Sequence, residues 1–165
     1  MAGVASPTLD VTKSIRGNTS GAGVFGHTLR IQWSATHMRQ EIQAEGVNPP
    51  ISHYTDAVRF GEVLYMSGCG PLDADLNLIG GDDVAAQARQ TLLNMQRVLK
   101  AAGAGFADVL KVTVYLTDVN DREAINPVRQ EFFGAARPAS TLIGVAALAI
   151  PGMKIEIEAV VGLPG

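Results

Sequence analysis

The stretch DDVAAQARQTLLNMQRVLKAAG (residues 82–103), followed by VLKVTVYLTDV (residues 109–119), decides the fold class. In the first segment apolar residues recur at helical spacing, and Asp82 or Asp83 can cap the N-terminus. Gly103 supplies a stop at the C-terminus. The second segment alternates apolar and polar side chains, which is typical of a strand. Together they predict a long helix that precedes a sheet strand.

The two segments also predict which side chains are buried. In the helix we expect a core stripe of Val84, Ala88, Leu92, Met95, Leu99 and Ala102. The polar positions of the helix are interpreted as a solvated face: Gln87, Gln90, Asn94 and Arg97. In the strand we expect one side to carry Leu110, Val112, Val114 and Leu116, and the other Lys111, Thr113, Tyr115 and Thr117.

The flanking segments complete an α+β pattern. AVRFGEVLYMS (residues 57–67) predicts a strand or a hairpin that turns near Gly61. NDREAINPVRQEFFG (residues 120–134) predicts a second, weaker helix, with a kink or restart at its proline. STLIGVAAL and MKIEIEAVVG predict two final strands around a Pro-Gly turn. This order favours a mixed sheet with two helices packed on one face. Thr113, Tyr115 and the polar side of the last strand would lie on the other face, which is neither clearly solvated nor clearly apolar. A sheet face of that kind usually meets another subunit, so we expect a closed homo-oligomer.

Composition excludes several classes of function. The 165 residues are 47% hydrophobic and 18% charged, with a net charge of -3, which indicates one globular domain. Neither this charge nor any basic cluster suggests nucleic acid or an anionic membrane as a partner. The single cysteine favours a reducing, cytoplasmic setting. The one cysteine and the three scattered histidines give no sign of a metal site. No apolar run is long enough for a membrane span.

The first 37 residues differ from the rest of the chain. They are rich in Gly, Ser and Thr and show no sustained period. His37-Met38 is what a common cloning junction encodes, and Met38 is a possible start residue. We therefore interpret residues 1–37 as a cloning leader or an upstream extension, although a native arm that packs on a partner subunit would look similar. Residues 38–165 form the single expected domain.

Two short segments are candidates for a site. The loop SGCGP (residues 67–71) has two glycines and a proline, which suits either close approach of a ligand to the backbone or a tight turn. In KIEIEA (residues 154–159), Glu156 and Glu158 share one face of a strand. From the pattern alone these carboxylates are best read as a solvated or lysine-paired strand edge.

Taken in order and spacing, these blocks resemble the RidA/YjgF family. The resemblance rests on the long helix, on ADVLKVTVYLTDVND, and on EFF, RPAS and KIEIEA, and it covers roughly residues 45–161. It implies a chorismate mutase-like fold and a homotrimer with sites in clefts between subunits. It also implies hydrolysis of 2-imino acids or their enamine tautomers to 2-keto acids and ammonia, with no metal and no organic cofactor.

The resemblance assigns roles to individual residues. Glu156 matches the glutamate that binds the attacking water, a role that contributes roughly 10²–10⁴-fold in general base catalysis. Glu158 is expected to be structural. The substrate-binding positions it implies are Tyr54, Gly68, Cys69, Asn120, Ser140 and Leu142. The hydroxyl groups of Ser140 and Thr141, with backbone N–H groups, could hold an amide, carbonyl or hydroxyl of the ligand. Cys69 has no visible base partner and is interpreted as a lining residue.

One position departs from the family. Active members carry an arginine two residues after the proline of the PAR(S/T) motif, where it clamps the substrate carboxylate. Here Ser140 stands in its place. A lost charge-assisted clamp removes about 1.5–3 kcal/mol, or about one to two decades of affinity. Arg137 could substitute, although an exposed loop charge is its more ordinary reading.

These observations lead to three hypotheses. The first is a RidA-like hydrolase of an imine, enamine or related small aminated metabolite, with a substrate other than a standard 2-imino acid. The second is a non-catalytic trimer that binds a small molecule or regulates a partner enzyme, which the serine at position 140 favours. The third, ribonuclease activity, comes from older family naming and lacks a basic RNA-binding surface.

Overall fold

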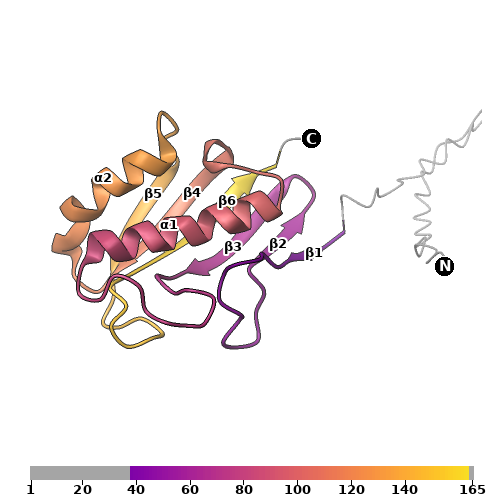
Figure 1. The fold of residues 1–165 in the computed structure, drawn as a ribbon. Coiled ribbons are helices and arrows are strands. Elements are labelled where there is room, and N and C mark those ends of the chain that lie inside the picture. The colour runs from indigo at the N-terminus through magenta and orange to yellow at the C-terminus, as the bar shows by residue number, and fades with distance from the viewer. Residues whose placement is uncertain (1–37, 164–165) are drawn as a thin grey trace, which may run out of the picture. The chain divides into compact units, whose positions relative to one another are not determined.

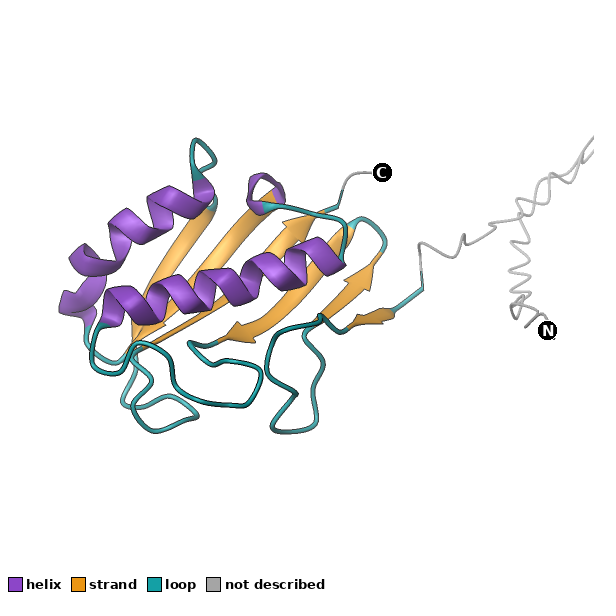
Figure 2. Ribbon diagram, viewed as in Figure 1, coloured by secondary structure: helices purple, strands orange, loops and turns teal. Residues whose placement is uncertain are grey.

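The computed structural model describes residues 38–163, which form one six-stranded sheet with both α-helices on the same face (Figures 1 and 2). The expectation for residues 1–37 lies outside the described residues. The strands are β1 (Gln40–Ile42), β2 (Ala57–Phe60), β3 (Val63–Cys69), β4 (Val109–Leu116), β5 (Ala139–Gly144) and β6 (Ile155–Gly162). The helices are α1 (Val84–Ala101), α2 (Arg122–Phe133) and the short 3₁₀ helices η2 (Phe106–Asp108) and η3 (Val119–Asp121).

The sheet is mixed, as the sequence predicts. Its strand order is β1-β2-β3-β6-β4-β5, and β4 and β5 are its one parallel pair. The C-terminal strand β6 is therefore central and lies between β3 and β4. The parallel pair follows from the connection between its strands, because α2 crosses over one face of the sheet before β5 begins.

Helix α1 begins and ends where its sequence signals predict. Asp83 is the N-cap, and its Oδ1 accepts hydrogen bonds from the backbone N–H groups of Ala85 and Ala86. Gly103 has a φ of +75°, the left-handed conformation that follows a helix end. The predicted apolar stripe from Val84 to Leu99 is buried against the sheet.

The prediction that the polar positions of α1 form a solvated face is wrong for two of the four residues. Gln87 is 0% exposed and Asn94 is 2% exposed, whereas Gln90 and Arg97 are partly buried. The physical reason is that the loops after β3 and before β6 cover this side of the helix. Their backbone groups need hydrogen-bond partners, and the two amide side chains supply them.

The predicted inward position of Leu110 is also wrong. A register shift in the pairing of β4 with β6, between Val109 and Lys111, interrupts the alternation of side chains. Val109 is consequently buried and Leu110 is 56% exposed, whereas Val112, Val114 and Leu116 face the core as expected.

Helix α2 contains the proline without interruption. Arg122–Phe133 is one helix with Pro127 inside it, so the predicted restart does not occur. Pro127 is exposed, and the hydrogen bond it removes lies away from the sheet. The helix ends at Gly134, as predicted. Its apolar face buries Ile125, Val128 and Phe133.

The face of the sheet opposite the helices carries exposed apolar side chains. Cross-strand pairs place Tyr65 beside Val58 and Ile143 beside Tyr115 on this face, and Tyr65 is 57% exposed. Phe60 is exposed here as well. Such an uncovered face is the feature from which the sequence predicts a homo-oligomer. Separately, none of the helices in residues 38–163 is long and apolar enough to cross a membrane.

Candidate active site

A cavity of about 280 Å³ opens where β3 ends and β6 begins, between the loop that precedes β2 and the loop that precedes β6. Its wall combines apolar side chains with polar groups that could orient a small molecule. The apolar part consists of Ile51, Leu72, Ala149, Ile150 and Met153, and the polar part of Asn48, Ser52, Tyr54, Ser67 and Glu156, with Gly68 and Gly70 between them.

Glu156 lies directly on the backbone of Gly68. A methyl group added at Gly68 would overlap the Oε1 atom of Glu156 and would lie 2.8 Å from its Cδ and 3.0 Å from its Cγ. Position 68 does not have a positive φ, so the glycine is required here by the carboxylate and not by the backbone conformation. The loop and the strand are therefore fitted to each other at the site.

The surroundings of Glu156 raise the pKa of its carboxyl group. Burial raises the pKa of the Glu156 carboxyl above its ordinary value of 4.5, and the charge of Glu158 on the same strand face raises it further. Tyr115 pairs with Glu156 across the strands, and burial together with Glu158 and Glu156 raises the pKa of its hydroxyl. A glutamate shifted in this way is suited to exchange a proton with a bound water.

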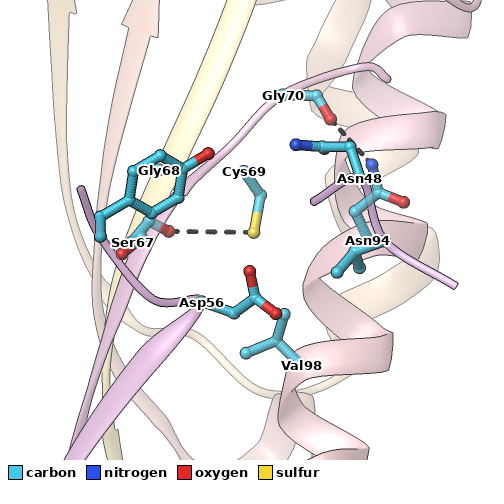
Figure 3. A pocket seen from close by; sticks show the side chains of 10 residues that line it. Asn48, Asp56, Ser67, Gly68, Cys69, Gly70, Asn94 and Val98 are labelled. Atoms are coloured by element: carbon cyan, nitrogen blue, oxygen red, sulfur yellow. Dashed lines mark hydrogen bonds between the residues drawn. The ribbon is translucent and has the colours of Figure 1, made fainter. Parts of the chain in front are cut away.

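Cys69 lies in a smaller adjoining cavity of about 30 Å³, shown in Figure 3. Its Sγ contacts the Ser67 carbonyl oxygen at 3.8 Å, and the carboxyl group of Asp56 lies close by. Burial, with the charges of Asp56 and Glu156, raises the pKa of the thiol to about 12. The residue is partly exposed, but its sulfur is protonated at neutral pH, which agrees with a lining role.

Gln87 of α1 holds the loop before β6. Its Nε2 donates to the carbonyl oxygens of Gly81 (2.6 Å) and Gly152 (2.9 Å), and its Oε1 accepts from the N–H of Lys154 (2.7 Å). Lys154 directly precedes β6, so this buried amide sets the point at which the strand that carries Glu156 begins.

Asn94, two turns further along α1, holds the loop after β3. Its Nδ2 donates to the carbonyl oxygens of Gly70 (2.9 Å) and Leu72 (2.8 Å), and its Oδ1 accepts from Arg97 (2.7 Å). The first of these bonds is drawn in Figure 3. Gly70 and Leu72 line the larger cavity, so the second amide positions the opposite wall.

The structure brings together part of the predicted site. Tyr54, Gly68 and Glu156 line the larger cavity, and Cys69 lines the adjoining one together with Tyr54 and Gly68. Tyr54 is exposed, and its hydroxyl accepts a hydrogen bond from the Ile51 N–H.

The other predicted site residues lie at the β5 edge of the same chain and line neither cavity. Register explains the separation. Ser140 pairs with Val112 and Leu142 with Val114, so both side chains point to the helix face of the sheet, whereas Glu156 lies on the opposite face. Thr141 shares the face of Glu156 but lies two strands away and in register with Glu158, so it is more than about 10 Å from Glu156.

Asn120 and Arg137 complete this second group. Asn120 lies in η3, which contacts β5, and its backbone N–H and Nδ2 both donate to Asp118 Oδ1. Arg137 is an exposed residue in the loop before β5. Within one chain, Ser140 and Leu142 therefore lie on the face opposite Glu156, and none of the five residues of this group lines either cavity.

Arg129, which lies beside Ser140, is not among the site residues predicted from the sequence. One guanidinium nitrogen of Arg129, on the last part of α2, is 3.1 Å from Ser140 Oγ. The signal in the sequence is its spacing: Arg129 comes four residues after the buried Ile125, which places a cation on the face of α2 that packs on the sheet. Gln87 and Asn94 were missed because they were assigned to a solvated face.

The α+β fold with its mixed sheet, Glu156 and the glycine loop at residues 67–71 are the features expected of the family that the sequence resembles. The sequence model of a family described as Endoribonuclease L-PSP matches residues 45–162. The chain belongs to this family, which is also called RidA/YjgF.

Individual relatives agree with that assignment. A RutC family protein of Pyrococcus horikoshii is 39% identical over 123 residues, which cover 74% of this chain and 97% of the relative. The human 2-iminobutanoate/2-iminopropanoate deaminase is 37% identical over 123 residues, which cover 74% and 89% of the two chains.

Solved structures show the same fold. The YjgF gene product of Escherichia coli matches with a TM-score of 0.69 and 34% identity, over 74% of this chain and 98% of that one. TdcF of Escherichia coli, solved with bound serine, matches with a TM-score of 0.70 and 31% identity, over 76% and 99% of the two chains.

Proposed function

We propose that this protein is a RidA-like hydrolase that releases ammonia from an imine, an enamine or a related small aminated metabolite. The observation that carries the proposal is Glu156: a partly buried carboxyl group of raised pKa, seated against Gly68 in a cavity of about 280 Å³. Relatives named as 2-iminobutanoate/2-iminopropanoate deaminases support this class of reaction.

The proposed reaction adds water across a C=N bond and then breaks the C–N bond. Glu156 accepts one proton from the water as its oxygen attacks the imine carbon, the π electron pair of the C=N bond moves to nitrogen, and Glu156 returns that proton to the nitrogen. The tetrahedral intermediate then collapses: its hydroxyl proton passes through Glu156 to the nitrogen, the C=O group forms, and the C–N electron pair leaves with the nitrogen as ammonia. The raised pKa of Glu156 supports both halves of this proton transfer, because the group gains and releases a proton closer to neutral pH than an ordinary glutamate.

We further propose that the complete site forms in a homotrimer. Glu156 and Ser140 lie on opposite faces of one sheet, so a cleft that contains both needs two subunits. The exposed apolar residues on the face opposite the helices, such as Tyr65, support an assembly that covers them. Tyr54, Gly68 and Cys69 would then face the Asn120, Ser140, Thr141 and Leu142 group of a neighbouring subunit.

Ser140 bears on the substrate. A hydroxyl group in place of an arginine gives no charge at that position, so we propose a substrate other than a standard 2-imino acid. The test is ammonia release from a panel of imines generated in situ, beginning with 2-iminopropionate, in wild type and in Glu156→Gln. Turnover of at least one imine that falls by 10² or more in the variant supports the proposal; equal rates in both proteins contradict it.

A second candidate is a trimer that binds a small molecule without converting it. Two observations favour it: the serine at position 140, and the serine bound in the related TdcF structure. The two candidates separate by calorimetry and turnover on the same compounds. Saturable binding with no ammonia release across the panel would favour the second.

A further inference from the structure

Arg129 is a cation placed beside a residue of the proposed site, although it comes from a different element of the fold. It lies on α2 and reaches across to β5, where its guanidinium donates to Ser140 Oγ at 3.1 Å. The side chains of Ser140 and Leu142 point to the face of the sheet that the helices cover, and Arg129 approaches from α2 on that same face. A longer side chain at position 140 would compete with Arg129 for this space.

The hydrogen-bonding capacity of Arg129 is largely unused. Its Nε is buried and has no hydrogen-bond partner within the described part of the chain, and the bond to Ser140 engages one of its five N–H groups. In residues 38–163, no carboxylate forms an ion pair with it, whereas Arg89 of α1 is paired with Glu131 of α2.

The surroundings of Arg129 make an unpaired charge costly. Burial lowers the pKa of its guanidinium, and no carboxylate among the described residues offsets this loss of hydration. A partly buried cation with free donors is stabilised when an anion binds it, and the planar guanidinium fork fits a carboxylate through two parallel hydrogen bonds.

We propose that Arg129 is the residue that recognises a carboxylate group on the substrate, and that the substrate is therefore an anionic imine or enamine. This inference rests on the proposed function, because it places Ser140 and its neighbours in the cleft that receives Glu156 from another subunit. The guanidinium group of Arg129 extends from α2 and is held by Ser140, so it lies at a different place from the side chain of an arginine on β5. In the substrate, the distance between the carboxylate group and the imine carbon would therefore differ from that in a standard 2-imino acid.

The test compares a carboxylate with its uncharged amide. The stable probes are 2-oxobutanoate and 4-oxopentanoate, each paired with its own amide, and the dissociation constants are measured by calorimetry or NMR. We expect the wild type to bind at least one carboxylate about 10- to 100-fold more tightly than the amide. Arg129→Met, which keeps the stem but removes the charge, should abolish this preference. Arg122→Met removes an exposed arginine of the same helix and is the matched control, expected to leave the preference unchanged.

Two further variants keep the test decisive if Arg129→Met folds poorly. Ser140→Ala leaves the charge but removes the bond that holds the guanidinium, and should reduce the preference severalfold. The exchange variant Arg129→Ser with Ser140→Arg moves the cation to β5 and should restore a preference, shifted between the two oxo acids because the charge has moved.

The results that overturn the inference are separable from those that overturn the proposed function. An unchanged carboxylate preference in Arg129→Met refutes the role of Arg129, even if imines are hydrolysed. A change in oligomer mass by light scattering, with the preference intact, shows instead that Arg129 pairs with a carboxylate of another subunit. If the wild type prefers carboxylates through Arg129 but releases no ammonia, the inference stands and the proposed hydrolysis fails.

Discussion

Replacing Gly68 by alanine tests the proposed role of Glu156 without altering Glu156 itself. The new methyl group would overlap Oε1 and would lie 2.8 Å from Cδ, whereas ordinary van der Waals contact begins at 3.4 Å. The carboxyl carbon must therefore withdraw by about 0.6 Å, and the overlapping oxygen by more. The φ of residue 68 is not positive, so the substitution adds no strain in the backbone.

The expected effect is large on the rate and small on stability. A displacement of about 1 Å at a reacting group can cost roughly 10² in rate, and the whole contribution of a general base is roughly 10²–10⁴. We therefore expect kcat for imine hydrolysis to fall by about 10²-fold or more. The free energy of unfolding should change by less than about 1 kcal/mol, because Gly68 is exposed and the atoms that must move are the end of a flexible side chain.

The assay is initial-rate ammonia release, with urea unfolding measured on the same preparations. Gly105→Ala is the matched control: Gly105 has a φ of -139° and an added methyl would meet no atom closer than 3.9 Å. A double-mutant cycle then isolates the mechanism. If Gly68→Ala reduces activity equally in wild type and in Glu156→Ala, the loss does not pass through the carboxylate and the reasoning is refuted.

Three further predictions concern stability and reactivity. Glu156→Gln should raise the melting temperature at neutral pH, because a raised pKa means that ionised Glu156 destabilises the fold. This gain in melting temperature should vanish as the pH falls below the ordinary glutamate pKa of 4.5. An unchanged melting temperature at pH 7 would contradict the raised pKa of Glu156. Alkylation of Cys69 by iodoacetamide at pH 8 should be roughly 10³-fold slower than that of a free thiol, since its pKa is about 12; fast labelling of folded protein would show an accessible thiolate. Gln87→Leu should lower the free energy of unfolding by about 2–4 kcal/mol through unpaired backbone groups, whereas the exposed Gln96→Leu should change it little; similar urea midpoints would count against the network.

The sequence predicts most of the fold because its local signals agree with tertiary packing. The caps of α1, the apolar stripe and the Pro-Gly turn each act over a few residues, and the structure follows them. The failures are non-local. Leu110 is exposed because β4 changes register against β6, a strand more than 40 residues later in the chain, and no pattern within residues 109–116 reveals that shift.

The site is predictable only in part for a similar reason. Glu156 and Gly68 are assigned by resemblance, and the structure places them in contact. A motif comparison does not find Arg129, because this arginine lies on α2, whereas the motif position that it contacts, Ser140, lies on β5. One chain places Ser140 and Glu156 on opposite faces of its sheet, so a cleft that contains both, as proposed above, would need a second subunit.

The buried amides of α1 show how the same helix serves both the core and the site. Gln87 and Asn94 are seven residues apart, so they lie on one side of the helix, next to the apolar stripe. Hydrophobic residues at these two positions would leave the carbonyl groups of Gly70, Leu72 and Gly152 without these hydrogen bonds. Those groups belong to the two loops that flank Gly68 and Glu156. The two buried amides of α1 therefore hold the irregular loops after β3 and before β6 against the core. These two loops form walls of the candidate site.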